Sequence, residues 1–133
     1  INALLSGEVQ MIIAEPGLVA PHVKSGKLKA LAVTSSTPTA LAPALPTVSA
    51  SGLPGYEWVG MTGIFVPIKT PAELINRLHQ EAARFLGRSE VKERFFSTGM
   101  EVVASSPQEF AAAIKSDMGH VARVIKDAGI KLE

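Results

Sequence analysis

A short loop at residues 14–17 has the best placement for binding chemistry in this chain. It follows an apolar run at residues 9–14 that is typical of a buried strand, and it precedes a helix-like segment at residues 18–26. In open α/β sheets, ligands bind beyond the carboxyl ends of strands, and a helix N-terminus offers free N–H groups and the positive end of a dipole. We therefore expect a site for a small anion here. The predicted site residues are Ala14, Glu15, Pro16 and Gly17.

Glu15 carries the only charge in this loop, and its sign opposes that of an anionic ligand. A carboxylate in a loop is more often simply exposed to solvent than part of a binding site. A negative ligand beside Glu15 requires that the side chain turns away or that the ligand also carries an amine. Backbone N–H groups and waters are therefore expected to make most of the hydrogen bonds to the ligand. Gly17 is expected to matter more than Glu15, because a side chain there would block close approach or would not fit the dihedral angles of the turn.

Other kinds of chemistry find little support in the sequence. The three histidines, His22, His79 and His120, lack the close spacing of a metal site, and the chain contains no cysteine. No serine stands in a G-x-S-x-G elbow, and the glycines form no phosphate-binding loop. Trp58 and Tyr56 are expected to serve core packing or a hinge rather than ligand stacking. We predict no catalytic residue, no metal and no cofactor.

The composition is that of a folded globular chain, with 133 residues, 47% of them hydrophobic and 19% charged. A formal net charge of +1 with scattered basic residues argues against nucleic acid as a partner. No apolar run is long enough to span a bilayer. The chain begins at Ile1, within a predicted helix and without the features of a signal peptide, so we expect it to be a fragment of a longer protein.

The elements that must position the loop follow an α/β pattern. Residues 9–14 and 28–34 are predicted as adjacent parallel strands, joined by a helix that ends at Gly26. Residues 56–67, with aromatic and branched side chains, are predicted as one long strand or two consecutive strands, and residues 100–104 as a short strand. We expect a parallel or mixed sheet with helices on both sides, which is the α/β fold class.

Capping residues predict three further helices, and Thr47 is predicted to cap a short one before them. The start and stop signals are Thr70-Pro71 for the first helix, Ser89 and Gly99 for the second, and Ser106-Pro107-Gln108-Glu109 and Gly129 for the third. The apolar faces of these helices need a partner surface, and without one we expect the fragment to self-associate. The residues concerned are Leu78, Phe85, Phe95 and Phe96.

Three segments together resemble one known family. They are PHVKSGKLKALAVTS at residues 21–35, LPTVSASGLPGYEW at residues 45–58 and TPAEL at residues 70–74. In order and spacing they resemble the tripartite tricarboxylate transporter receptors, which are also called Bug-type periplasmic solute-binding proteins. Each motif is mostly structural, and the resemblance covers the C-terminal part of those proteins nearly end to end.

The resemblance implies an α/β fold like that of the type II periplasmic binding proteins, in which two lobes close on a ligand. This chain would be the C-terminal part of that two-lobe fold. Residues 1–58 would belong to the second lobe, and residues 59–67 would form a crossing strand or hinge. Residues 68–133 would supply the C-terminal helices and the strand that complete the first lobe.

The resemblance also implies a periplasmic, and therefore extracytoplasmic, solute-binding receptor rather than an enzyme. Its ligand would be a small carboxylate, a related organic anion or an amino acid. Its other partners would be the membrane subunits of a tripartite tricarboxylate-type transporter. One alternative stays open, namely a small α/β enzyme, a hydrolase or transferase, whose catalytic residues lie outside this chain.

Overall fold

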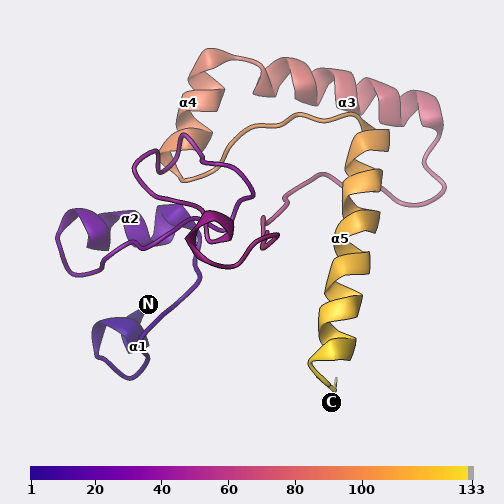
Figure 1. The fold of residues 1–133 in the computed structure, drawn as a ribbon. Helices are drawn as coiled ribbons and strands as arrows, with labels where there is room; N and C mark the ends of the chain where they lie inside the picture. The colour runs from indigo at the N-terminus through magenta and orange to yellow at the C-terminus, as the bar shows by residue number, and fades with distance from the viewer. Residues whose placement is uncertain (132–133) are drawn as a thin grey trace. The chain divides into compact units, whose positions relative to one another are not determined.

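A computed structural model describes residues 1–131 of the chain (Figure 1). Apart from one isolated β-bridge, the regular secondary structure of these residues is helical. In chain order the elements are α1 (Asn2–Leu5), α2 (Pro16–Lys24), the 3-10 helix η1 (Ser49–Ser51), α3 (Ala72–Leu86), α4 (Ser89–Ser97) and α5 (Pro107–Asp127). No helix in this described part combines the length and the apolar character needed to cross a membrane.

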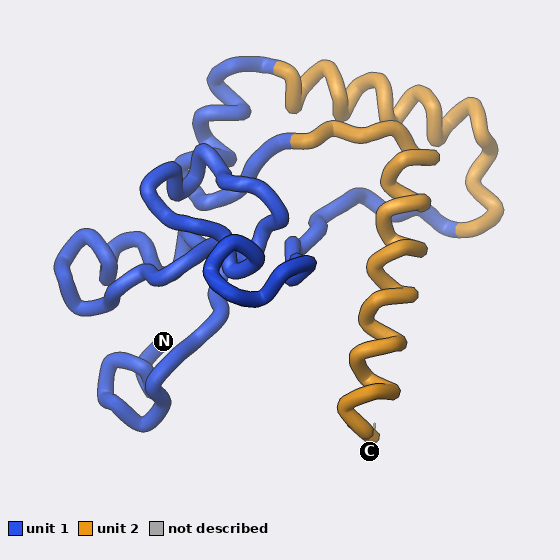
Figure 2. Tube along the Cα trace, viewed as in Figure 1, with its two compact units in different colours: residues 1–67, 88–102 blue, residues 68–87, 103–133 orange. Residues whose placement is uncertain are grey.

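The described chain divides into two compact units, drawn in blue and orange in Figure 2. The first unit contains residues 1–67 and 88–102, and the second contains residues 68–87 together with those from 103 onward. As a result, α4 groups with α1, α2 and η1, although α3 and α5 flank it in the sequence. The assignment of residues 1–58, 59–67 and 68–133 to lobes and a hinge stays a prediction.

Glycine stops three helices at the positions that the sequence predicts. These residues are Gly26 after α2, Gly99 after α4 and Gly129 after α5, with φ values of 70°, 84° and 65°. Residues that carry a Cβ are strained at positive φ, so glycine is preferred where a helix ends in this way. After α4, the N–H of Gly99 donates to Phe96 O at 3.0 Å. The next N–H, of Met100, donates to Phe95 O at 3.0 Å, which completes a Schellman motif.

Side-chain capping starts α5 as predicted, whereas the predicted start of α3 is off by one residue. Ser106 is the N-cap of α5, and its hydroxyl accepts from Glu109 N–H at 3.2 Å. At α3 the N-cap is Pro71 rather than Thr70, and no side chain caps the helix. The reason is that Pro71 keeps an extended ψ of 141°, so helical backbone angles begin only at Ala72.

The capping box of α5 predicts that the stability of the protein depends on pH. Ser106 N–H and the Ser106 hydroxyl both donate to Glu109 Oε2 at 2.8 Å. These bonds, with the backbone one dominant, lower the pKa of Glu109 from its ordinary value of 4.5. A lowered pKa gives a stability contribution that is present above 4.5 and is lost as the pH falls through the folded-state pKa.

We therefore expect Glu109→Gln to remove part of the acid sensitivity of the full-length protein. Urea unfolding at a series of pH values, from neutral to below 4.5, measures this effect. Glu73→Gln is the matched control, because Glu73 lies in the first turn of α3 without a cap hydrogen bond. Equal acid sensitivity in the two variants would contradict the prediction.

The predicted strands are the main error of the sequence analysis. Within residues 1–131 the β-pairing consists of a single parallel bridge between Val33 and Thr47. Val33 N–H donates to Pro46 O, and Val48 N–H donates to Val33 O, both at 2.9 Å. A strand exists only through hydrogen bonds to a neighbour, so a strand-like composition does not suffice where no neighbour lies beside it. The predicted strands that form no ladder are residues 9–14, 28–34, 56–67 and 100–104.

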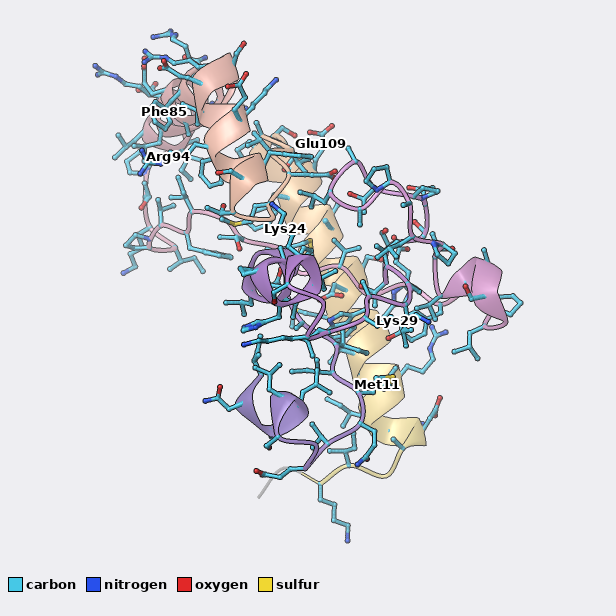
Figure 3. All side chains as sticks on the ribbon, turned by 90° about the vertical axis from the view of Figure 1, so that its left-hand side faces the viewer. Met11, Lys24, Lys29, Phe85, Arg94 and Glu109 are labelled. Atoms are coloured by element: carbon cyan, nitrogen blue, oxygen red, sulfur yellow. The ribbon has the colours of Figure 1, made fainter. Side chains whose placement is uncertain are left out.

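The prediction that residues 9–14 pair with residues 28–34 is therefore wrong for the described chain. Apolar side chains of the unpaired segments face outward instead. Met11, labelled in Figure 3, is 70% exposed, and Ile64 is 76% exposed. In α/β folds such side chains are covered by helices or neighbouring strands. The described residues thus provide apolar surface that they do not cover themselves.

Burial is confined to two residues in the described chain. They are Val91 in α4, which is 8% exposed, and Thr47, which is 4% exposed. Thr47 Oγ1 accepts from Ala50 N–H at 3.0 Å, and Thr47 O accepts from Ser51 Oγ at 2.7 Å. The N-cap of η1 is nevertheless Val48, one residue later than the predicted Thr47.

The helix faces named for self-association are open to solvent to different degrees. Leu78, Phe85 and Phe96 are exposed, whereas Phe95 is half-buried. Exposed apolar surface of this kind favours association. Self-association of the isolated fragment stays a prediction.

Candidate ligand-binding site

The predicted site loop is the N-terminus of α2 itself. Glu15 is the N-cap, with extended angles of φ −60° and ψ 133°, and Pro16 is the first helical residue. The sequence predicts a turn at Pro16 and Gly17 and a helix from Leu18, so the helix starts two residues earlier than predicted. Proline fits the first helical position because it lacks an N–H and has a preset φ. Residues 14–17 therefore join an extended segment directly to a helix start.

The N-terminus of α2 is not capped by a side chain. Leu18 N–H donates to Glu15 O at 3.0 Å, which closes the first turn through the backbone. Glu15 is exposed, and a Cβ built on Gly60 would lie 3.3 Å from Glu15 Oε1. The carboxylate therefore lies beside Gly60 and does not accept a capping hydrogen bond from α2.

A backbone contact holds the first turn of α2 against the end of α4. A Cβ built on Gly17 would overlap the carbonyl oxygen of Thr98 and would lie 2.9 Å from its carbonyl carbon. A Cβ built on Gly99 would overlap Gly17 N and would lie 3.0 Å from Gly17 Cα. Real Cβ atoms do not come so close, and protein interiors leave little room for adjustment. Glycine is thus required on both sides of this contact, and for Gly17 the reason is packing rather than positive φ.

Two shallow depressions flank this contact within the first unit. One has a volume of ≈ 250 Å³ and contains Lys24, labelled in Figure 3, as its only charged residue. Its lining residues are Pro16, Gly17, Ala20, Lys24, Leu41, Phe96, Ser97 and Gly99. The other has a volume of ≈ 180 Å³ and is lined by Arg94, Phe95, Thr98 and Met100. Each combines apolar walls with a single cation.

Thr98 and Gly99 are the residues near the site that sequence reasoning misses. Gly99 is predicted as the stop of α4, but nothing local indicates that it meets Gly17. Two glycines at the ends of predicted helices are the only signal, and many helix ends carry one for local reasons. The contact is therefore a product of tertiary structure.

The structure also bears on the histidines, the carboxylates and Trp58. The described residues contain no group of three or more His, Asp or Glu side chains that could hold a metal ion. Trp58 is 52% exposed, so it does not pack in a core of the described chain as expected. Its backbone N–H donates to Thr34 O at 2.8 Å, which ties the start of the 56–67 segment to residue 34.

Comparison with known families assigns nearly the whole chain. A sequence model described as "Tripartite tricarboxylate transporter family receptor" matches residues 1–130. A UPF0065 protein of Bordetella bronchiseptica is 29% identical over 128 residues, which are 96% of this chain and 38% of that protein. Protein BugT of Bordetella pertussis is 29% identical over 130 residues, which are 98% of this chain and 40% of BugT. The chain spans less than half the length of these two curated relatives.

Solved structures show the same relationship. Rpa4515 of R. palustris, solved with adipate, matches with a TM-score of 0.83 and 28% identity over 96% of this chain and 43% of that chain. The periplasmic binding protein BugD matches with a TM-score of 0.77 and 29% identity over 99% of this chain and 45% of BugD. The α/β, periplasmic-binding-protein-like fold class is therefore confirmed, and this chain has part of that two-lobe fold.

The matched family is one of transport receptors, and it contrasts with the enzyme alternative left open by the sequence. The family match, the curated relatives and the structural neighbours all agree, and together they cover almost all of the chain. The chain belongs to the tripartite tricarboxylate transporter receptor family, as the resemblance of its three sequence segments implies.

Proposed function

We propose that this chain is part of a periplasmic, extracytoplasmic solute-binding receptor that holds a small carboxylate at the N-terminus of α2. One observation carries the proposal, namely that residues 14–17 lead from an extended segment straight into a helix whose N-terminus has no side-chain cap. Pro16 has no N–H and Leu18 N–H donates to Glu15 O, so the donors left at this helix end are those of Glu15 and Gly17. The helix dipole favours a negative partner for them. A carboxylate is a ligand of that kind.

The position of Glu15 supports the same proposal. Its carboxylate lies beside Gly60 and is not bonded to the N–H groups of α2, so this side chain does not occupy the helix N-terminus. Ala14, Pro16 and Gly17 carry no charge, and any ligand at this helix end would meet mainly backbone. The structure solved for Rpa4515 contains adipate, which makes a six-carbon dicarboxylate the natural first probe.

The proposed partners follow from the family. The receptor would present its ligand to membrane subunits of a tripartite tricarboxylate-type transporter. Lobe closure would cover the carboxylate, with residues 59–67 as part of the hinge. An amino acid is the second ligand class in the proposal, because its amine could pair with Glu15.

Titration calorimetry of the full-length protein tests the function. We expect adipate, or another dicarboxylate from a series of different chain lengths, to bind, and adipamide to bind far more weakly. Adipamide has the same carbon chain without charge, so the comparison isolates the carboxylates. If no carboxylate and no amino acid binds, the proposed function is wrong.

Glu15→Gln separates the two ligand classes. For a dicarboxylate we expect binding about 1.4- to fivefold tighter, because removing an exposed like charge is worth about 0.2–1 kcal/mol. For an amino acid we expect weaker binding, since the partner of the amine is lost. Glu8→Gln, which removes another exposed carboxylate of the first unit, controls for net charge. A dicarboxylate that binds Glu15→Gln more weakly than the parent protein contradicts the proposed orientation of Glu15.

A further inference from the structure

We propose that the turn Thr98-Gly99 is a positioning element that holds the ligand-binding end of α2 in place by backbone contact alone. The ligand part of this inference rests on the proposed function, whereas the positioning part stands on the contact itself. Gly17 and Gly99 leave no room for a Cβ on either side, so the two backbones touch directly. Residues of this kind act on the ligand through α2 and do not touch it.

The first turn of α2 needs such an external support. Helix ends are the parts of a helix that open most readily, and this end lacks the side-chain cap that would oppose opening. A cap from Ser, Thr or Asp would bind the same N–H groups that an anion needs. A backbone contact stabilises the turn without a side-chain acceptor; Leu18 N–H donates to Glu15 O, and Gly17 N packs against Gly99.

The supporting turn is itself well held. Phe95 O accepts three hydrogen bonds, from Thr98 N–H and Met100 N–H at 3.0 Å each and from Thr98 Oγ1 at 2.7 Å. The Schellman motif fixes Gly99 at φ 84°. α4 also contains Val91, one of the two buried residues in the described chain. A turn with this many local bonds can act as a fixed surface for Gly17.

Gly99→Ala in the full-length protein tests the proposal against Gly129→Ala. Both glycines follow a helix at positive φ, 84° and 65°, so both variants carry backbone strain of the same kind. A Cβ on Gly129 meets nothing within 4 Å, whereas a Cβ on Gly99 overlaps Gly17 N. We expect Gly99→Ala to weaken adipate binding about tenfold, which is about 1.4 kcal/mol, and Gly129→Ala to leave it unchanged.

Hydrogen exchange gives a readout that needs no ligand. In the ligand-free protein, Gly99→Ala is expected to speed exchange of the amides of Leu18 and Val19 in the first turns of α2, and Gly129→Ala is not. If the parent protein binds no carboxylate, the proposed function is wrong. The positioning role is then tested only by comparing amide exchange in Gly99→Ala and Gly129→Ala. Equal exchange at Leu18 and Val19 in the two variants overturns the proposal.

A milder pair of variants keeps the test valid if Gly99→Ala does not fold. Thr98→Ala removes the hydroxyl that donates to Phe95 O at 2.7 Å, and Ser97→Ala removes an equivalent hydroxyl that donates to Arg94 O at 2.7 Å. The Thr98 carbonyl occupies the Cβ position of Gly17, and no atom of Ser97 is among the three nearest there. We expect faster exchange at Leu18 for Thr98→Ala alone, and the same rate in both variants overturns the proposal.

Discussion

Gly17→Ala is expected to lower the free energy of unfolding of the full-length protein by about 1–3 kcal/mol, the usual range for overpacking. The added Cβ would overlap Thr98 O, which is backbone and cannot move aside as a flexible side chain can. Helix propensity alone predicts the opposite sign, because alanine is the best helix former and glycine one of the worst. Urea unfolding, with the midpoint and slope compared with those of the parent protein, measures the change.

Gly119→Ala is the matched control for this prediction. Gly119 also lies within a helix, α5, and a Cβ there would meet nothing within 4 Å. With no clash, the propensity term acts alone and should raise stability by about 1 kcal/mol. The two substitutions are the same chemical change and are expected to have opposite signs. If Gly17→Ala is as stabilising as Gly119→Ala, the backbone contact with Thr98 is absent in solution.

This contact changes how a bulky substitution at Gly17 must be interpreted. The sequence-based expectation is that Gly17→Val would harm ligand binding by blocking close approach of the ligand or by straining a turn. Gly17 lies in a helix and does not have positive φ, and its Cβ position is occupied by the Thr98 carbonyl. A loss of affinity in Gly17→Val would therefore report displaced packing, not a direct ligand contact.

Ala14→Asp is expected to weaken adipate binding by about tenfold or more, because it places a like charge next to the proposed carboxylate position. Two unit charges 4 Å apart interact by about 4 kcal/mol at an effective dielectric constant of about 20, and solvent and salt reduce that figure. Ala14 is half-buried and immediately precedes the N-cap, so a charge there is only partly screened. Calorimetric titration of the full-length variant with adipate measures the loss.

Ala14→Asn controls for shape in the same experiment. Asparagine has nearly the size of aspartate without its charge, so it should bind adipate within about threefold of the parent protein. The difference between the variants should shrink as salt is added, because screening acts on the charge term alone. Equal affinities for Ala14→Asp and Ala14→Asn would mean that the carboxylate binds elsewhere, and residues 14–17 would no longer be a candidate site.

Helix boundaries in this protein follow from neighbouring residues. The Ser106–Glu109 capping box and the stop at Gly129 involve residues within a few positions of each other, so their energetics are contained in a short stretch of sequence. The family resemblance has a similar basis, because the ordered segments at residues 21–35, 45–58 and 70–74 are themselves sequence. Both predictions are confirmed by the structure and by the family match.

Strands could not be predicted in the same way. Residues 9–14 have a strand-like composition, but pairing depends on which other segment lies alongside. In the described chain only Val33 and Thr47 form a β-bridge. The loop between them contains three prolines, and its composition does not determine the conformation that brings the two residues together. A strand is a relation between two segments, and a pattern within one segment cannot specify the other.

For the candidate site, too, one part was predictable from the sequence and another part depends on tertiary contacts. The sequence by itself placed residues 14–17 in a loop just before a helix and made an anion site there reasonable, because helix N-termini attract anions for local reasons. Only the tertiary structure turned Glu15 towards Gly60 and set Gly99 against Gly17. Such contacts join residues that are distant in sequence. They depend on how whole helices and segments pack together, which no short stretch of sequence determines.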